Sequence, residues 1–246
     1  MLYFLYFILG SIFGSFLNVL IYRVPNNLSI AFPRSFCPHC KNTIPFYRNI
    51  PIFSFLIQLG KCADCNKRIS PSYPITEFLT GLIFVIGLNG FTIPESIQFI
   101  LVSSLLLAIS IIDHKYYIIP FQISLTILFI LIPYTIFYTN TMYHIYGMLI
   151  GLSYLLFIFI ITWIATKKQP IGFGDIQLVI LLGLWLGPMK ILLTIFLAAC
   201  LGILYWIILL LISGYKRDRK LPFGTFLSIS SIIVYMIPLN WDFFLN

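Results

Sequence analysis

Two aspartates stand where an apolar run ends or begins. Asp113 closes the run LVSSLLLAISIID, and Asp175 follows the segment GFG and opens a second run. The chain has only seven acidic residues. An ionisable side chain near the centre of a spanning helix costs at least about 2.5–3.5 kcal/mol and by default indicates function. The competing interpretation is that both aspartates simply mark helix ends at a membrane surface.

A pair of carboxylates can perform acid–base catalysis without a nucleophilic side chain. Two close carboxylates in a low-dielectric site share one proton and titrate as a unit, as in aspartic proteases. The ionised aspartate takes a proton from water, which attacks a peptide carbonyl, and the neutral one donates a hydrogen bond to the carbonyl oxygen. Asp113 and Asp175 are therefore predicted to be catalytic. His114 is the alternative partner for Asp113, but neighbours i and i+1 do not share a helix face. His114 is therefore predicted to be an interface residue.

The glycines before Asp175 predict an active-site loop. Gly172 and Gly174 suit a backbone that turns sharply and lets a substrate strand approach. Only about 12 apolar residues separate Asp175 from Pro188, which at about 1.5 Å per residue falls short of a membrane core of roughly 30 Å. This predicts a short or partly unwound helix beside a wet cavity.

Four cysteines form two close pairs, CPHC at 37–40 and CADC at 62–65. Four thiolates can close a tetrahedral shell around one zinc ion. The 41–61 spacer is slightly longer than the usual 15–20 or so residues. Two disulfides are the competing interpretation, although they are rare in a reducing cytoplasm. His39 could replace one cysteine. The predicted ligands of a structural zinc are Cys37, Cys40, Cys62 and Cys65.

Composition indicates which elements must position these residues. Hydrophobic residues make up 60% of the chain and charged residues 9%, with mean hydropathy +1.01. Soluble domains carry roughly 25% charged residues. The chain is therefore predicted to be an all-α polytopic membrane protein with about eight transmembrane helices and a small zinc-binding cytoplasmic loop domain. The candidate spans are 2–21, 74–90, 95–113, 118–138, 145–165, 172–189, 190–212 and 222–240.

The positive charges predict an orientation. Met1–Tyr22 carries no charged side chain, unlike a cleaved signal peptide with its basic start. With the N-terminus outside, the cytoplasmic segments are 22–73, 114–117, 166–171 and 213–221. They hold all of the 15 lysines and arginines except Lys190, as the positive-inside rule requires. The net charge of +8 thus reflects topology, and nucleic acid is not the expected partner.

The predicted organisation has three parts. Residues 1–22 form the first transmembrane helix, 23–73 the cytoplasmic CxxC…CxxC domain, and 74–246 a seven-helix membrane peptidase domain. A loop of about 50 residues buries too little surface to fold alone, so the metal would supply folding energy. Glu77 either begins the second span or faces this loop.

The chain resembles the type IV prepilin peptidases of bacterial pilus, secretion and competence systems. The matching segments appear in family order: GSFLNVLIYRVP at 14–25, the paired CxxC loop, RISPSYPITE at 68–77, IDHKYYIIP at 112–120, GFGDIQLVILLGLWLG at 172–187 and LPFGTFLSIS at 221–230. The set spans nearly the whole chain. The chain lacks G-x-S-x-G, H-E-x-x-H and Walker motifs, and this argues against serine peptidase, zinc peptidase and ATPase functions.

The resemblance implies an activity, cofactors and partners. The family's two catalytic aspartates fall on Asp113 and Asp175. Members cleave the leader of prepilins and pseudopilins at the cytoplasmic face of the bacterial cell membrane. Many then N-methylate the new N-terminal residue with S-adenosylmethionine, so this cofactor, zinc, prepilin substrates and the lipid bilayer are the implied partners. The composition is most similar to competence-type members.

Two departures from the family pattern are visible. Phe121 stands where the family often has aspartate, and Gln177 stands where GxGDxK has lysine. The first leaves Asp113 as the acid of its segment, and the second removes a possible charge partner of Asp175. Two alternatives remain: a peptidase that has lost methylation, and a non-catalytic membrane scaffold with a zinc loop.

Overall fold

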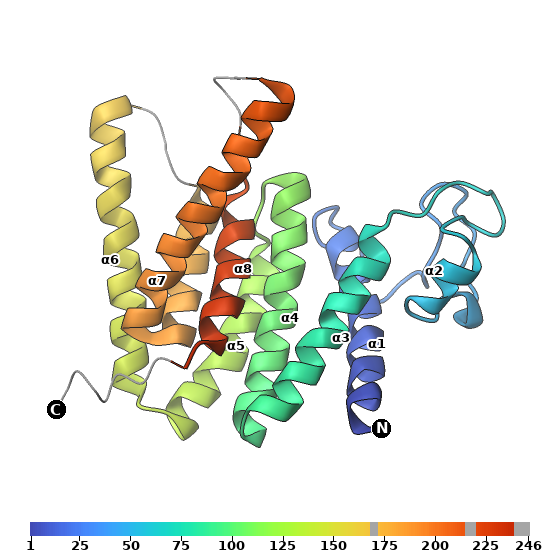
Figure 1. Cartoon of the computed structure of the whole chain (residues 1–246), viewed down its shortest axis with the longest axis horizontal. Coiled ribbons are helices and arrows are strands. Elements are labelled where there is room, and N and C mark those ends of the chain that lie inside the picture. Colours follow the sequence, from blue (N-terminus) through green and yellow to red (C-terminus); the bar gives the residue numbers. More distant parts are fainter. Residues whose placement is uncertain (168–171, 215–219, 239–246) are drawn as a thin grey trace. The chain divides into compact units, whose positions relative to one another are not determined.

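The described part of the structure, a computed structural model, comprises residues 1–167, 172–214 and 220–238. Its regular elements are helices, apart from two isolated bridges, which confirms the all-α class (Figure 1). The elements are α1 (Leu2–Arg23), η1 (Phe46–Arg48), α2 (Phe53–Ile57), α3 (Ser72–Gly90), α4 (Ile93–Tyr116), α5 (Phe121–Tyr138), α6 (Thr141–Thr166), α7 (Phe173–Ser213) and α8 (Phe223–Met236).

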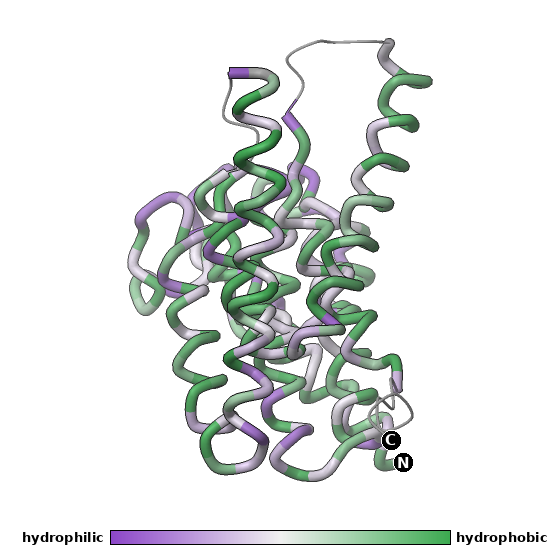
Figure 2. The backbone as a smooth tube through the Cα atoms, turned by 90° about the vertical axis from the view of Figure 1, so that its left-hand side faces the viewer, coloured by the Kyte–Doolittle hydropathy of each residue, from purple (hydrophilic) through white to green (hydrophobic). Residues whose placement is uncertain are grey.

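The helices correspond to the predicted spans. In the described residues six helices are long and apolar enough to cross a membrane, and α8 is a shorter apolar helix. Figure 2 shows hydrophobic residues along these helices and hydrophilic ones in the connections. The helix α7 consists of two arms joined at a kink, which match the separate spans 172–189 and 190–212. The predicted last span, 222–240, corresponds to α8, although residues 239 and 240 lie outside the described ranges.

The chain forms two compact units, Met1–Ala108 and Ile109–Asn246, divided within α4. The first unit holds α1, the cysteine loop, α3 and the start of α4. The second holds the last turns of α4 together with α5 to α8. This grouping places α3 with α1, whereas the sequence analysis assigned the residues of α3 to a domain over 74–246. The three-part organisation stays a prediction.

In the first unit α1 packs closely against α3 through small residues. A Cβ added to Gly10 would lie 2.7 Å from the carbonyl oxygen of Thr80, and one added to Gly14 would lie 2.7 Å from Cα of Glu77. The two glycines are four residues apart and so share one helix face. Such a small-xxx-small pattern lets helix backbones approach in a membrane, where packing replaces the hydrophobic effect as the driving force.

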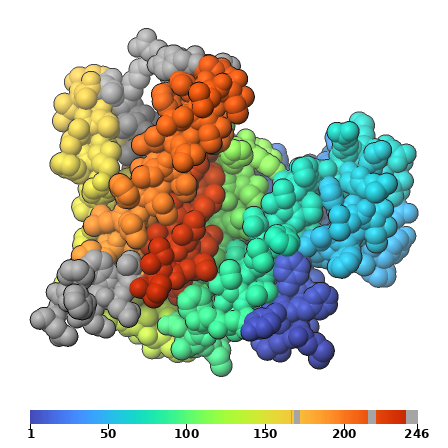
Figure 3. Space-filling view, in the orientation of Figure 1, coloured from blue at the N-terminus to red at the C-terminus, as the bar shows by residue number. Residues whose placement is uncertain are grey.

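In the second unit α6 and α7 approach in the same way. A Cβ added to Gly183 would lie 2.5 Å from the carbonyl oxygen of Gly147. The outgoing arm of α7 then packs along α8, and Figure 3 shows these two helices side by side. Lys190 donates to the carbonyl oxygen of Tyr235 near the end of α8. Gly202 faces Phe226 near its start. The outgoing arm and α8 are therefore antiparallel.

The kink in α7 has a local cause. Gly187 has φ 76° and ψ 177°, a backbone conformation that favours glycine. Pro188 follows and has no N–H to donate to the carbonyl of Leu184. His144 of α6 replaces that donor, because its Nδ1 lies 2.8 Å from the carbonyl oxygen of Leu184. A buried carbonyl that the proline would have orphaned is thus satisfied by a neighbouring helix.

Candidate functional site

Asp113 lies in the last turns of α4 and is 5% exposed. Its Oδ2 accepts two hydrogen bonds from Thr225, one from the backbone N–H at 2.7 Å and one from the hydroxyl at 3.1 Å. Thr225 belongs to the first turn of α8, whose N-cap residue, Pro222, makes no side-chain cap bond. Asp113 therefore caps α8 from another helix and satisfies one of its free N–H groups.

Asp175 lies in the first turn of α7 and caps its own helix. Its Oδ2 accepts a hydrogen bond of 3.2 Å from the backbone N–H of Gly172. The side chain is half-buried. Both predicted catalytic carboxylates thus lie at helix N-termini, where the helix dipole favours negative charge.

The two carboxylates are neighbours in the second unit. Asp113 acts electrostatically on Asp175 as a like charge. The structure thus brings together groups that lie on different helices and more than 60 positions apart in the sequence.

Ile119 connects the segments around the pair. A Cβ added to Gly174 would lie 3.0 Å from Cβ of Ile119, and one added to Gly224 would lie 2.7 Å from its Cδ1 and 3.1 Å from Oδ2 of Asp113. Gly174 and Gly224 therefore pack on one half-exposed side chain beside Asp113. Gly172 has φ −72° and ψ 148°, backbone angles that any residue can adopt. The predicted sharp turn therefore does not explain why this position is a glycine.

Sequence reasoning missed three residues of this site: Ile119, Gly224 and Thr225. None is ionisable, so a search that starts from rare charges in apolar runs passes over them. The segment LPFGTFLSIS was available as part of the family resemblance, and its glycine and threonine are the signal that could have indicated them.

The structure places the two residues that depart from the family pattern, Phe121 and Gln177. Phe121 begins α5 and is 63% exposed. Gln177 lies two residues after Asp175, and its Nε2 is buried without a hydrogen-bond partner among the described residues. His114 is exposed, and its ring meets Tyr205 of α7 edge-on with centroids 6.1 Å apart.

The four predicted metal ligands form one cluster. The Sγ atoms of Cys37, Cys40, Cys62 and Cys65 all lie within 4.8 Å of one another. Those of Cys37 and Cys65 are 3.9 Å apart. A tetrahedron with Zn–S bonds of about 2.3 Å has edges of about 3.8 Å. The donor set and its size therefore fit zinc.

Each cysteine pair lies in a turn of the same design. In the first, Cys37 N–H donates to Asn42 and Lys41 N–H donates to Cys37. In the second, Cys62 N–H donates to Lys67 and Asn66 N–H donates to Cys62. Lys41 and Asn66 occupy equivalent positions, and both have positive φ, at 64° and 56°. The bridges Phe36↔Thr43 and Lys61↔Arg68 close the two turns.

The neighbouring thiols shift one another's pKa. Burial raises the pKa of the Cys37 thiol, but hydrogen bonds from the backbone amides of Cys40 and His39 and from nearby thiols outweigh it and lower the pKa to about 7. For Cys40, a backbone hydrogen bond with Asn42 lowers the pKa, but desolvation and the neighbouring thiols raise it to about 11. Four adjacent thiolates need a cation to coexist, which zinc would supply.

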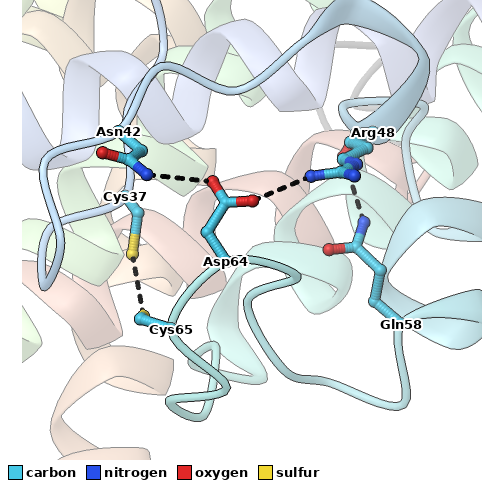
Figure 4. Close-up of polar contacts among 6 residues, drawn as sticks. All are labelled: Cys37, Asn42, Arg48, Gln58, Asp64 and Cys65. Atoms are coloured by element: carbon cyan, nitrogen blue, oxygen red, sulfur yellow. Dashed lines mark hydrogen bonds and ion pairs between the residues drawn. The ribbon is translucent and has the colours of Figure 1, made fainter.

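Asp64 links the two halves of the cysteine loop (Figure 4). Its carboxylate forms an ion pair of 3.0 Å with Arg48 and a hydrogen bond of 3.4 Å with Asn42. Both Asp64 and Arg48 side chains are 37% exposed, so this pair contributes little energy in water. Its effect is to fix the second turn against the 41–61 spacer.

Two buried charged residues attach the loop to its helices. The guanidinium of Arg23, 4% exposed, donates to four backbone carbonyls of the segment after α1, those of Ser29, Ile30, Pro33 and Arg34. Glu77 of α3 accepts a hydrogen bond of 2.7 Å from the backbone N–H of Ile52. Glu77 therefore faces the loop, the second of its two predicted roles.

Three polar side chains in the first unit are buried and bonded to backbone groups. Asn18, Arg23 and Glu77 are buried in the first unit, but each already bonds to a backbone group of that unit. These three side chains therefore help to hold the first unit together.

Comparison with known proteins matches two adjacent families. Residues 8–91 match the bacterial peptidase A24 N-terminal domain, and residues 99–207 match the type IV leader peptidase family. No solved structure matches the chain.

Three curated relatives illustrate the similarity. A type 4 prepilin-like proteins leader peptide-processing enzyme of Escherichia coli O78:H11 (strain H10407 / ETEC) is 32% identical over 91% of this chain and 89% of its own length. Prepilin leader peptidase/N-methyltransferases of Bacillus subtilis (strain 168) and Dichelobacter nodosus are 33% and 30% identical, covering 94% and 91% of this chain and 92% and 87% of their own lengths. With that identity and that coverage, the chain belongs to the type IV leader peptidase family.

Proposed function

We propose that this chain is an intramembrane aspartic endopeptidase that removes the leader of type IV prepilins and pseudopilins at the cytoplasmic face of the bacterial cell membrane. The observation that carries the proposal is the neighbouring pair Asp113 and Asp175 in a chain of this family. The names of the relatives supply the substrate class.

The proposed reaction needs only the two carboxylates and a water molecule. The ionised aspartate accepts a proton from water, and the oxygen of that water attacks the carbonyl carbon of the scissile peptide. The protonated aspartate donates to the carbonyl oxygen and stabilises its developing charge. The C–N bond then breaks, and a proton from the dyad passes to the leaving amine. No covalent enzyme intermediate forms.

The substrate must lose helical structure to react. Prepilins carry an apolar stem after the cleavage site, which would lie in the bilayer while the positive leader stays at the cytoplasmic face. A helical backbone shields its carbonyls, so the peptide has to unwind beside the dyad. The half-exposed side chain of Ile119 lies beside Asp113, where the peptide would unwind.

The two cofactors would have separate roles. Zinc would be held by Cys37, Cys40, Cys62 and Cys65, and with four protein ligands it leaves no position for a reactive water. Its contribution would be to fold the loop. S-adenosylmethionine would supply a methyl group for the new N-terminus. This second activity is proposed from the relatives' printed names alone.

Replacement of each aspartate tests the peptidase. Asp113→Asn and Asp175→Asn should each abolish prepilin cleavage in isolated membranes, read by gel shift and mass spectrometry. Glu95→Gln is a matched control, because the half-buried Glu95 lies at the other end of α4, where it accepts hydrogen bonds from Thr92. Normal processing by either aspartate variant would refute the dyad and favour the scaffold alternative.

The mass of the mature pilin N-terminus tests methylation. An added methyl group on that residue marks methyl transfer.

 The same peptide without it would support a peptidase that has lost the second activity. Because both products require cleavage, this measurement separates the two enzymatic alternatives from each other, and the aspartate variants separate both from the scaffold.

A further inference from the structure

Thr225 offers Asp113 two donors at once. The backbone N–H and the hydroxyl of Thr225 both reach Oδ2 of Asp113, at 2.7 and 3.1 Å. Thr225 is 8% exposed and Asp113 is 5% exposed, so water competes little for these bonds. Because both donors bind the same oxygen, they fix the plane of the carboxylate and do not engage Oδ1.

The hydroxyl of Thr225 also lies 2.9 Å from the carbonyl oxygen of Ser110, one turn before Asp113 in α4. A hydroxyl has a single hydrogen and two lone pairs, so it can donate to only one of these oxygens at a time. When Asp113 is ionised, the hydroxyl can donate to Oδ2. When Oδ2 carries a proton, the carboxyl can donate to the hydroxyl, which then donates to Ser110. Thr225 can therefore stay bonded to Asp113 in either protonation state.

We propose that Thr225 is a positioning residue for peptide cleavage, which holds Asp113 in one orientation while its carboxyl gains and loses a proton. This inference rests on the proposed catalytic role of Asp113. A carboxylate that exchanges a proton during turnover needs a partner that tolerates both states, and a fixed N–H donor alone favours only the ionised one. The side-chain hydroxyl supplies that tolerance.

Substitutions of different shape separate positioning from packing. Thr225→Val keeps the volume and the backbone N–H but removes the hydroxyl, and Thr225→Ser keeps the hydroxyl but removes the methyl group. We expect kcat for cleavage of a purified prepilin to fall about 10- to 100-fold in the valine variant, with KM unchanged. The serine variant should stay within about threefold of the parent chain.

The matched control is Thr194→Val. Thr194 is fully buried in α7, and its hydroxyl bonds to the carbonyl of Lys190 within the same helix. This change should leave kcat near that of the parent chain. If instead Thr225→Val cleaves normally while Thr225→Ser is slow, the residue acts by packing and the inference is wrong.

Two further measurements keep the test decisive. If thermal melting in detergent shows that Thr225→Val is unfolded, Thr225→Ser is compared with Thr225→Ala: activity in serine but not in alanine supports the hydroxyl, and equal losses overturn it. Asp113→Asn is measured in parallel. An active asparagine variant would refute the proposed function itself, whereas an inactive one beside a fully active Thr225→Val refutes only the role of Thr225.

Discussion

At the scale of single residues, the two carboxylates accept hydrogen bonds from backbone N–H groups at helix N-termini. Asp113 caps α8 from α4, and Asp175 caps its own helix α7. Charge at a helix N-terminus is stabilised by about 0.3–1 kcal/mol, and by up to about 2 kcal/mol when partly buried. Backbone N–H donors stabilise the carboxylates without adding a positive charge to an apolar bundle. A cation beside Asp175, which the Gln177 position lacks, is therefore not required for the pair to carry a negative charge.

The contacts of Ile119 lead to a prediction about Gly224. Gly224→Ala would place a methyl group 2.7 Å from Cδ1 of Ile119 and 3.1 Å from Oδ2 of Asp113. Overpacking of this kind costs about 1–3 kcal/mol, so we expect cleavage to slow by about tenfold or more. The double variant Gly224→Ala with Ile119→Ala should recover most of that loss in a prepilin cleavage assay.

The control for this pair is Gly90→Ala, because a Cβ at Gly90 would meet nothing within 4 Å. It should cleave at the parental rate. If the double variant is as slow as Gly224→Ala alone, the glycine is needed for something other than room for Ile119, and approach of the substrate backbone becomes the better explanation.

At the scale of elements, the cysteine loop consists of two equivalent turns that become one domain only when their sulfur atoms share a metal. The loop contains one short α-helix and one 3-10 helix, and its bridges are isolated. A segment of this size buries too little surface to be stable alone. Arg23 holds the start of the loop to α1, and Glu77 holds its middle to α3, both through backbone groups.

This arrangement predicts one zinc ion per chain. Elemental analysis of the purified protein should give near-stoichiometric zinc, and Cys62→Ser should lose most of it. Cys200→Ser is the control, because Cys200 is exposed on α7 and outside the cluster. Zinc far below one equivalent in the parent chain would instead favour free thiols or disulfides.

Zinc retention should also depend on pH. A thiol binds zinc only after it loses its proton, so protons compete with the metal. Without metal the pKa of Cys37 is about 7 and that of Cys40 about 11. The zinc content after dialysis should therefore fall as the pH is lowered from about 8 towards about 5. Retention that does not change over this range would contradict ligation by four thiolates.

The kink in α7 gives a prediction about His144. His144→Leu removes the donor to the carbonyl of Leu184, which Pro188 cannot replace. A buried carbonyl left without a partner costs about 1–3 kcal/mol, so the variant should unfold more readily in detergent. His144→Asn retains a donor and should lose less stability. Equal stability of His144→Leu and the parent chain would show that the carbonyl is satisfied in another way.

At the scale of the whole molecule, the charges predict how the chain lies in the membrane. Gly90 ends α3 and should be outside, whereas Lys220 precedes α8 and should be inside. In a Cys200→Ser background, a membrane-impermeant thiol reagent should label Gly90→Cys in intact cells. It should label Lys220→Cys only after permeabilisation. The reverse pattern would contradict the predicted orientation.

The sequence predicts the parts of this molecule that carry rare or repeated residues. Asp113 and Asp175 are exceptional in apolar runs, and four cysteines at a regular spacing indicate a metal site without any structure. The helix class and the break before Lys190 follow from hydropathy and from Pro188. These features are visible because each is a local departure from a uniform apolar background.

The remaining features depend on contacts between distant segments. Thr225 lies 112 positions after Asp113, and a buried threonine in an apolar helix has no local signal. Ile119 likewise has no local signal, because its role depends on contacts with Gly174 of α7 and Gly224 near the start of α8. The partner of Leu184 is a histidine 40 positions away. Only the packing of the helices brings these neutral groups into contact.

The reversal of α7 at Gly187 and Pro188 has a consequence for biosynthesis. The helix has 41 residues, about 62 Å of α-helix, roughly twice the thickness of a bilayer core. Its two arms are joined without a hydrophilic loop, so neither arm offers the insertion machinery a polar signal at which to stop. We expect the arms to enter the lipid together as a preformed hairpin, with Lys190 as the charge carried across. The two crossings of α7 would then be completed as one cooperative insertion step.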